Sequence, residues 1–141
     1  MDGLMKGKKG LIMGVANDRS IAWGIAKACH EAGAELAFTY QGEALERRVK
    51  PLAEQVGSTL VMPCDVTDES SLDTTFETLK KEWGGIDFIV HAIAFSDKSE
   101  LDGRYVDTTR ANFLKTMDIS VYSFTAVAQK ALPFLNEGAS L

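Results

Sequence analysis

The segment LIMGVANDRSIAWGIAKACHEAG, from Leu11 to Gly33, carries the pattern that most clearly indicates the architecture of this chain. It begins with a short apolar run that reaches Gly14, continues as a polar loop, and then follows a helical pattern from Ser20. A strand, a glycine-containing turn and a helix in this order form the first half of a dinucleotide-binding βαβ unit. The N–H groups of such a turn and the dipole of its helix favour the negative charge of a pyrophosphate.

The glycine spacing of this turn departs from the common G-x-G-x-x-G fingerprint, because Ala16 and Arg19 stand where that pattern needs glycine. Gly14 permits the tight turn after the strand. Ser20 is a favourable helix N-cap, and its hydroxyl could also reach a phosphate. We expect Gly24, one turn into the helix, to let helix and strand pack closely. An ordinary βα turn with a serine cap explains the same residues about as well.

Composition is ordinary for a soluble globular protein. The 141 residues suffice for one domain with a sizeable core, and 45% of them are hydrophobic. The net charge of −5 and the lack of a basic stripe make nucleic acid and anionic membranes poor partners. No stretch reads as a signal peptide or is able to span a bilayer. Cys29 and Cys64 are not spaced as metal ligands and are expected to be buried free thiols of the reducing cytoplasm.

Apolar periodicity alternates between strands and helices along the chain. Strands are expected at about 10–13, 34–40, 59–62 and 86–92, and helices at about 20–32, 43–56, 69–83 and 109–131. Pro51 is expected to kink or split its helix, and Ser140 to begin a fifth strand. The alternation predicts an α/β fold: a Rossmann-like, doubly wound parallel sheet with helices on both faces. Residues 1–141 would be its first four βα units, the N-terminal part of a single NAD-binding domain.

Each expected helix carries apolar residues three and four apart, from which its buried face is predicted. In the 69–83 helix these residues are Leu72, Phe76, Leu79 and Trp83. The first helix is expected to bury Ile21, Ala22, Ile25, Ala28, Cys29 and Ala32. The long helix is expected to bury Met117, Val121, Phe124, Ala128 and Ala131, and to carry Ile119, Tyr122 and Val127 outside that face.

Ligands of parallel sheets bind beyond the carboxyl ends of the strands. Four loops are therefore expected to face a site: 14–20, 40–42, 64–67 and 92–97. In the second of them, Gln41 is neutral and can hydrogen-bond ribose hydroxyls, which favours NAD over NADP. Arg47 and Arg48, about one turn into the next helix, weaken that preference, and Gln41 is also compatible with a solvated loop.

The third and fourth loops offer contacts to adenosine. Asp65 can accept a hydrogen bond from the adenine amino group while the N–H of Val66 donates to the ring, although Asp65 also suits a helix N-cap region. Ile93 is expected to pack against adenine or ribose. His91, near the end of a buried strand, is interpreted as a core residue rather than a catalyst.

Several segments resemble, in order and spacing, the bacterial NADH-dependent enoyl-acyl-carrier-protein reductases of the short-chain dehydrogenase/reductase superfamily. The segments are GVANDRSIAWGIA from Gly14, ELAFTYQ from Glu35, CDV from Cys64, HAIAFS from His91 and DISVYSF from Asp118. Together they cover nearly the whole chain, and the Gly14-x5-Ser20 spacing is similar to that family's own variant of the glycine turn.

The resemblance implies a cofactor, a substrate and an assembly. NAD(H) would contact Gly14, Ser20, Ile21, Gln41, Asp65, Val66 and Ile93. Ser96 falls where the enoyl substrate lies beside the nicotinamide, although the family more often has a small apolar residue there. The substrate would be carried on acyl carrier protein for fatty-acid elongation, and the 109–131 helix would pack against a neighbouring subunit of a homotetramer.

The family's catalytic Tyr-x6-Lys pair is missing, as is the Tyr-x3-Lys pair of the wider superfamily. None of Tyr40, Tyr105 and Tyr122 is followed by lysine at either spacing. The motif is expected beyond Leu141, so no catalytic residue is assigned and residues 1–141 alone are expected to be inactive, with the fourth strand as an apolar edge prone to association. The alternatives are another short-chain dehydrogenase/reductase, or a non-catalytic dinucleotide-binding module.

Overall fold

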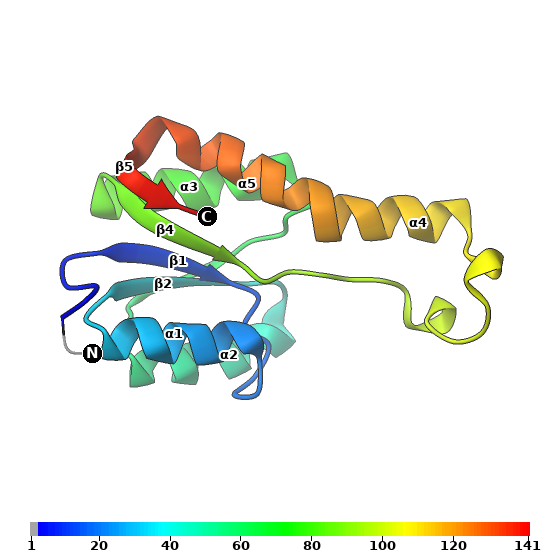
Figure 1. Ribbon diagram of the computed structural model, residues 1–141, viewed down its shortest axis with the longest axis horizontal. Coiled ribbons are helices and arrows are strands. Elements are labelled where there is room, and N and C mark those ends of the chain that lie inside the picture. The colour runs from blue at the N-terminus through cyan, green and yellow to red at the C-terminus, as the bar shows by residue number, and fades with distance from the viewer. Residues whose placement is uncertain (1–2) are drawn as a thin grey trace.

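The computed structural model describes residues 3–141, which form a five-stranded sheet (Figure 1). The strands are β1 (Lys9–Met13), β2 (Glu35–Tyr40), β3 (Leu60–Pro63), β4 (Ile86–His91) and β5 (Leu135–Ser140). They pair in parallel in the order β3-β2-β1-β4-β5. The predicted Rossmann-like parallel sheet is confirmed, and its order reverses between β1 and β4, where ligands of such folds bind.

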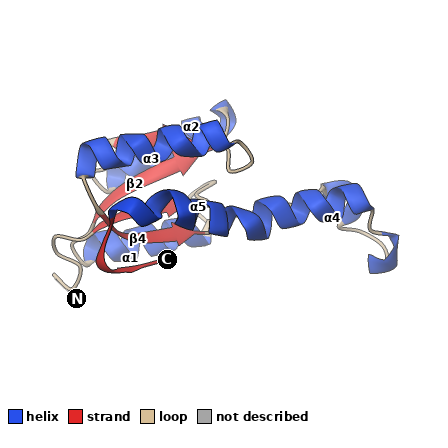
Figure 2. Cartoon of the chain, turned by 90° about the horizontal axis from the view of Figure 1, so that it is seen from above, coloured by secondary structure: helices blue, strands red, loops and turns tan. Residues whose placement is uncertain are grey.

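Helices cover both faces of this sheet. They are α1 (Ile21–Glu31), α2 (Glu43–Gln55), α3 (Glu69–Trp83), α4 (Arg110–Met117) and α5 (Ser123–Ala131). Figures 1 and 2 show α1 and α2 on one face, α3 and α5 on the other, and α4 projecting beyond the sheet. A π-helical segment, Asp118–Tyr122 (the π segment), joins α4 to α5, and 3₁₀ turns occur at Lys98–Glu100, Tyr105–Asp107 and Leu132–Phe134. Within residues 3–141, no helix is both long and apolar enough to cross a membrane.

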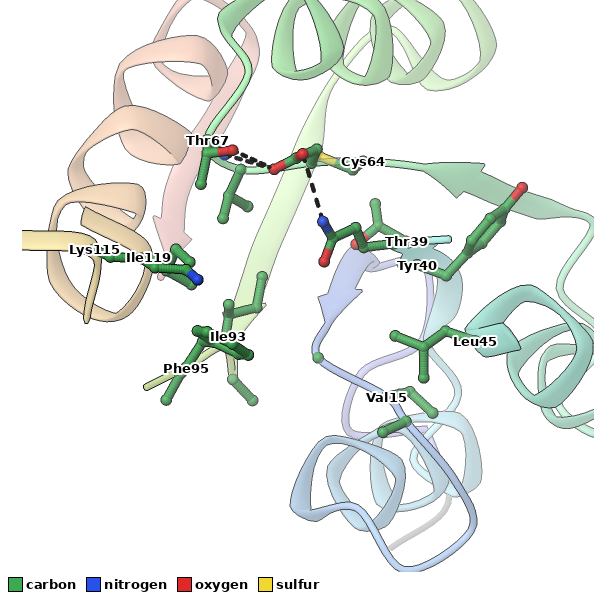
Figure 3. A pocket seen from close by; sticks show the side chains of 17 residues that line it. Val15, Thr39, Tyr40, Leu45, Cys64, Thr67, Ile93, Phe95, Lys115 and Ile119 are labelled. Atoms are coloured by element: carbon green, nitrogen blue, oxygen red, sulfur yellow. Dashed lines mark hydrogen bonds between the residues drawn. The ribbon is translucent and has the colours of Figure 1, made fainter. Parts of the chain in front are cut away.

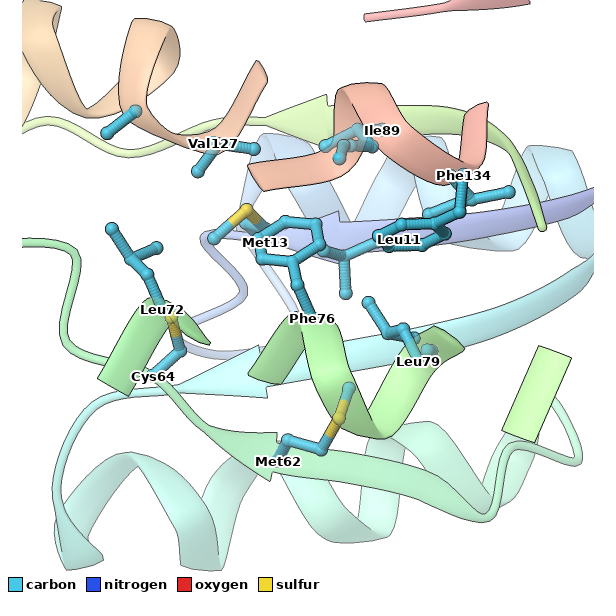
Figure 4. Packing of buried hydrophobic residues seen from close by; sticks show 14 residues of the cluster. Leu11, Met13, Met62, Cys64, Leu72, Phe76, Leu79, Ile89, Val127 and Phe134 are labelled. Carbon is cyan, nitrogen blue, oxygen red and sulfur yellow. The ribbon is translucent and has the colours of Figure 1, made fainter. Parts of the chain in front are cut away.

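The sheet separates two hydrophobic clusters, because side chains of a strand alternate between its faces. Leu11 and Met13 of β1 point toward α3 and α5, whereas Ile12 between them points toward α1 and α2. Figure 4 shows the first cluster, which includes Leu72, Phe76, Leu79, Ile89, Val127 and Phe134. Burial on both faces explains why the strand segments are apolar runs rather than alternating patterns.

The buried face of α1 is rotated relative to the prediction. Its buried residues are Ala22, Trp23 and Ala26. Ile21 and Ile25, predicted to be buried, are 80% and 36% exposed, and Ala28, also predicted to be buried, is exposed. The Trp23 ring is the physical reason, because it packs at a centroid distance of 6.4 Å from Phe38 of β2. Burying this large ring turns the two isoleucines outward.

The buried face of the long helical run also differs from the prediction. The fully buried positions are Asn112, Ser123, Ala126, Val127 and Ala131. Met117, Val121 and Phe124 are 40%, 53% and 42% exposed, whereas Val127, predicted to lie outside the buried face, is fully buried. Positions 123, 127 and 131 are four apart and therefore form one face of α5, and that face is the buried one.

The fifth strand begins earlier than predicted, at Leu135 rather than Ser140. Between the pairs Ile86–Leu135 and Phe88–Ser140, two steps along β4 match five along β5, so β5 bulges. Asn136, Glu137 and Gly138 of β5 are poor strand formers, so the apolar periodicity of the sequence did not predict a strand there. β4 is therefore flanked by β1 and β5, and the prediction of an exposed β4 edge is wrong. The expected split of α2 is also wrong, because that helix continues through Pro51.

Candidate functional site

A cavity of about 650 Å³ lies at the carboxyl ends of the strands, at the β1–β4 switch point (Figure 3). Its lining residues are 14–16, 39–41, 45, 64–67, 92–95, 115 and 119. Each of the four loops predicted to face a site contributes to this lining. The size is typical of sites for small molecules and cofactors.

Gly14 brings the ends of β1 and β4 into contact. Its φ of +106° lies in a region that favours glycine, and a Cβ there would meet the carbonyl oxygen of Ala92 at 2.0 Å. Only glycine fits this close approach. Gly24 differs, because an added Cβ would have no atom within 4 Å, so the predicted close packing at Gly24 is wrong.

Ser20 organises the turn instead of capping α1 through its side chain. It occupies the N-cap position but makes no side-chain cap bond. Its Oγ accepts hydrogen bonds from the N–H groups of Ala16, at 2.9 Å, and Asn17, at 3.1 Å. The hydroxyl hydrogen remains free to donate, and helix geometry leaves the N–H of Ile21 without an intrahelical acceptor. Neither Ser20 nor Ile21 lines the cavity itself, but both lie where an anion beside the turn would meet donors.

Gln41 and Asp65 meet across the ends of β2 and β3. The amide Nε2 of Gln41 lies 3.5 Å from Oδ2 of Asp65, and the other carboxylate oxygen accepts from the N–H and hydroxyl of Thr67, at 2.9 and 2.7 Å (Figure 3). Thr67 therefore orients the carboxylate. Asp68, not Asp65, caps α3 by accepting from two N–H groups of its first turn. Asp65 is thus free to present its second oxygen to the cavity.

The surroundings of Tyr40 bear on which dinucleotide fits. Burial, followed by the nearby carboxylate of Glu46, raises the pKa of the Tyr40 phenol. Neither Arg47 nor Arg48 is among the residues that line the cavity. The charges beside the end of β2 are those of Glu46 and its ion-pair partner Lys50, and neither residue lines the cavity.

Apolar side chains face one another across the cavity. Figure 3 shows Ile93, Phe95 and Ile119 grouped on one side, and Val15 and Leu45 on the opposite side. Val66 and Ile93 are partly buried and also pack against the α3–α5 cluster. Such an arrangement can hold a flat ring between apolar surfaces.

Ser96 does not line the cavity. Its Oγ accepts from the side-chain amide of Asn112 at 3.0 Å and from the hydroxyl of Thr116 at 3.1 Å, which ties it to α4. Asn112 is 4% exposed, and its Oδ1 also accepts from the N–H of Asp97 at 3.0 Å. A role for Ser96 beside a substrate stays a prediction.

Lys115 and Ile119 line the cavity although the sequence analysis assigned neither to the site. The ammonium of Lys115 lies 2.8 Å from a carboxylate oxygen of Asp97 and 4.9 Å from the ring centroid of Phe95. Both residues come from the long helical run, whose approach to β4 no local pattern encodes.

His91 lies outside the cavity lining and is half-buried, in line with its interpretation as a core residue. Its Nε2 is 2.7 Å from Oγ of Ser123, and burial lowers its pKa. Cys64 is buried and Cys29 half-buried, both as free thiols whose pKa values are raised by burial. Within residues 3–141, His, Cys, Asp and Glu side chains form no group able to hold a metal ion.

Comparisons with known proteins agree on one family. The sequence model described as Enoyl-(Acyl carrier protein) reductase matches residues 14–141. The chain is 63% identical over 139 residues to Enoyl-[acyl-carrier-protein] reductase [NADH] 1 of Rhizobium meliloti, an alignment that covers 99% of this chain and 51% of that relative. The chain spans about half the length of the curated relatives it matches.

Solved structures give the same result. The enoyl-(acyl-carrier-protein) reductase of Anaplasma phagocytophilum in complex with NAD has a TM-score of 0.94 at 57% identity, covering 99% of this chain and 54% of that chain. The Bacillus cereus enoyl-acyl carrier protein reductase with NADP⁺ and indole naphthyridinone has a TM-score of 0.93 at 50% identity, covering 97% of this chain and 54% of that chain.

Proposed function

Because this chain belongs to the enoyl-(acyl carrier protein) reductase family, we propose that its cavity holds NADH in an NADH-dependent enoyl-acyl-carrier-protein reductase. The reaction reduces trans-2-enoyl thioesters for fatty-acid elongation. The cavity at the β1–β4 switch point, lined by four strand-end loops, is the observation that carries this proposal. When bound, NADH supplies a hydride to the β-carbon of the enoyl group.

The residues present fit a dinucleotide. The close approach at Gly14 clears space for a pyrophosphate beside the turn, where the hydroxyl of Ser20 and the N–H of Ile21 point their dipoles at an anion. Gln41 and Asp65 hydrogen-bond the ribose and the adenine edge. The last contacts come from the apolar lining, where Val66 and Ile93 pack against the adenosine.

The rest of the catalytic centre is assigned outside residues 1–141. Tyr40, Tyr105 and Tyr122 lack a lysine at the family's spacing, and the curated relatives are about twice as long as this chain. In the whole protein, the missing tyrosine would stabilise the enolate oxygen and the missing lysine would hold the cofactor ribose. Ser96 would lie near the enoyl group, which is delivered on acyl carrier protein.

The assembly and compartment belong to the same proposal. Exposed apolar residues on α4 and the π segment support a homotetramer, because such surfaces mark protein interfaces; they are Phe113, Leu114, Met117, Val121 and Tyr122. The two free cysteines support a reducing cytoplasmic location.

Binding and turnover measurements test the cofactor assignment. Calorimetric titration should show that NADH binds the full-length protein. Asp65→Asn should weaken this binding about tenfold, because a charged hydrogen-bond acceptor is lost. Glu77→Gln is the matched control, since Glu77 is exposed on α3 and away from the cavity. Steady-state rates with a crotonyl thioester should be higher with NADH than with NADPH.

Three results would contradict the proposal in different ways. A clear preference for NADPH would indicate that Arg47 and Arg48 contact a 2′-phosphate. A folded protein that binds neither dinucleotide would indicate that the Gly14 turn is an ordinary βα connection. Turnover by residues 1–141 alone would contradict the assignment of the catalytic pair to a later part of the protein.

A further inference from the structure

Two serine hydroxyls, one in the π segment and one directly after it, contact the end of β4 and the residues that follow it, and neither belongs to the dinucleotide contacts described above. Ser120 lies within the π segment and Ser123 directly follows it. π turns are rare in helices and frequent at functional sites. The contacts that these two serines make with β4 therefore bear on how the cavity is built.

Ser120 satisfies both backbone groups of Phe95 with one hydroxyl. Its Oγ accepts from the N–H of Phe95 at 3.0 Å and donates to the carbonyl oxygen of the same residue at 3.2 Å. Phe95 follows the last residue of β4, His91, and has no neighbouring strand to pair with. The hydroxyl thus takes the place of a strand partner beyond the end of the sheet.

Ser123 makes the second connection, at the last residue of β4. It is 1% exposed, and its hydroxyl donates to the carbonyl oxygen of Ile119 at 2.6 Å. The same hydroxyl lies 2.7 Å from Nε2 of His91, within hydrogen-bond distance. The start of α5, directly after the π segment, is therefore joined to the last residue of β4.

Residues 92–95, named here the β4 wall, lie between these two connections. All four residues line the cavity, as does Ile119 of the π segment. Figure 3 shows Ile93, Phe95 and Ile119 on the same side of the cavity. The backbone of the β4 wall is thus held at its start by His91 and Ser123, and at its end by Ser120.

We propose that Ser120 and Ser123 form a two-point clasp that sets the position of the β4 wall, with Ser120 as a positioning residue for dinucleotide binding. This inference rests on the proposed function, since it assumes that a dinucleotide packs against Ile93. Without the clasp, the wall keeps its side chains but loses the backbone contacts that place them.

The loop beyond the β4 wall has separate anchors on α4. Asp97 is held by the side-chain amide of Asn112 and by the ammonium of Lys115. Loss of the Ser120 hydroxyl therefore leaves that loop attached and loosens the wall itself. This separation lets a positioning role be distinguished from a general loss of stability.

The test measures NADH affinity and backbone amide exchange in the full-length protein. Ser120→Ala should raise the Kd for NADH about threefold to tenfold, the effect of one or two partly exposed hydrogen bonds, and speed exchange of the Phe95 amide. Ser120→Thr keeps the hydroxyl and should restore both values. Ser99→Ala is the control, because Ser99 is exposed in the same loop and lines no part of the cavity.

Two outcomes would overturn the clasp. A lower melting temperature of Ser120→Ala with unchanged Kd for NADH would show a merely structural role. Unchanged exchange of the Phe95 amide would show that Ser120 does not hold the wall. If the unaltered protein binds no NADH, the proposed function fails, and the Phe95 exchange rate still decides whether the clasp exists.

Discussion

Two glycines of the first βα unit, Gly14 and Gly24, were both expected to allow close packing, but their structural roles differ. Gly14 has a positive φ and touches the backbone of Ala92, whereas Gly24 faces open space on α1. The difference arises because a strand end must pass its neighbour closely, while the exposed side of a helix has no neighbour. Only one of the two glycines is therefore required by the fold.

Alanine substitutions at these positions should act in opposite directions. Gly14→Ala should lower the free energy of unfolding by about 2–4 kcal/mol, because the Cβ clashes and the backbone is strained. Gly24→Ala should raise it by up to about 1 kcal/mol, because alanine favours a helix interior. Urea unfolding of the two variants measures both effects, and a neutral Gly14→Ala would contradict the close approach to Ala92.

His91 should give the protein a pH dependence in a defined window. Burial holds its pKa below the ordinary value of 6.5, so the unfolded chain binds a proton more readily than the folded one. The stability that His91 contributes is thus fully present above pH 6.5 and is lost as the pH falls below it. Urea midpoints between pH 8 and about 5 should fall in the wild type and stay flatter in His91→Gln.

The acidic groups whose pKa values are lowered affect the stability in a different pH range from His91. Asp68 and Asp87 both have pKa values below their ordinary value of 3.8, so their contributions disappear at more acidic pH than that of His91. An equally steep fall in the midpoint of His91→Gln above pH 5 would show that another group is responsible.

At the scale of elements, α3 was the most predictable helix and the α4–α5 run the least. The observed bounds of α3, Glu69–Trp83, equal the predicted ones. An aspartate cap, an apolar stripe and two closing glycines mark α3 locally. The α4–α5 run lacks such agreement, because its buried side chains include the polar residues Asn112 and Ser123, whose partners lie on the loop after β4 and on β4 itself.

The cap of α3 can be tested directly. Asp68 accepts from two N–H groups of the first turn. Asp68→Ala should lower the melting temperature by about 2–4 °C, the usual effect of losing a helix cap in a domain of this size. Glu77→Ala, on the exposed side of the same helix, should leave it nearly unchanged. Equal melting temperatures for the two variants would show that the cap is dispensable.

At the scale of the whole molecule, exposed apolar side chains concentrate on the part that projects from the sheet. Figures 1 and 2 show α4 extending away from the body of the domain. Leu114 on this helix is 59% exposed, and Tyr105 in the preceding turn is 82% exposed. Contiguous apolar surfaces of this kind are usually covered in the assembled protein.

A charge on α4 should therefore disturb the proposed tetramer. Leu114→Glu in the full chain should shift the mass measured by light scattering from four subunits toward smaller species, because a carboxylate would be buried without a partner. Leu4→Glu is the control, since Leu4 is 73% exposed in the N-terminal turn, away from α4. A monomeric wild type at micromolar concentration would contradict the tetramer itself.

The amino-acid sequence was enough to predict the parallel α/β fold, the location of the cavity at the strand ends, and most of its lining from β1 to β4. These features follow from local signals: apolar runs, three- and four-residue spacing, and Gly14 after the first strand. Gln41, Asp65, Val66 and Ile93 were found for the same reason, because they directly follow strands whose ends must meet at one edge of the sheet.

Three features depend on tertiary packing: which helix faces are buried, where β5 pairs, and how the side of the cavity formed by Lys115 and Ile119 is built. Trp23 sets the face of α1 by meeting Phe38, and Ser120 reaches Phe95 across 25 positions of sequence. Such contacts depend on how whole helices and strands pack together in a dense interior, and a short stretch of neighbouring residues does not specify them. Lys115 and Ile119 therefore entered the site through the packing of a helix rather than through a motif.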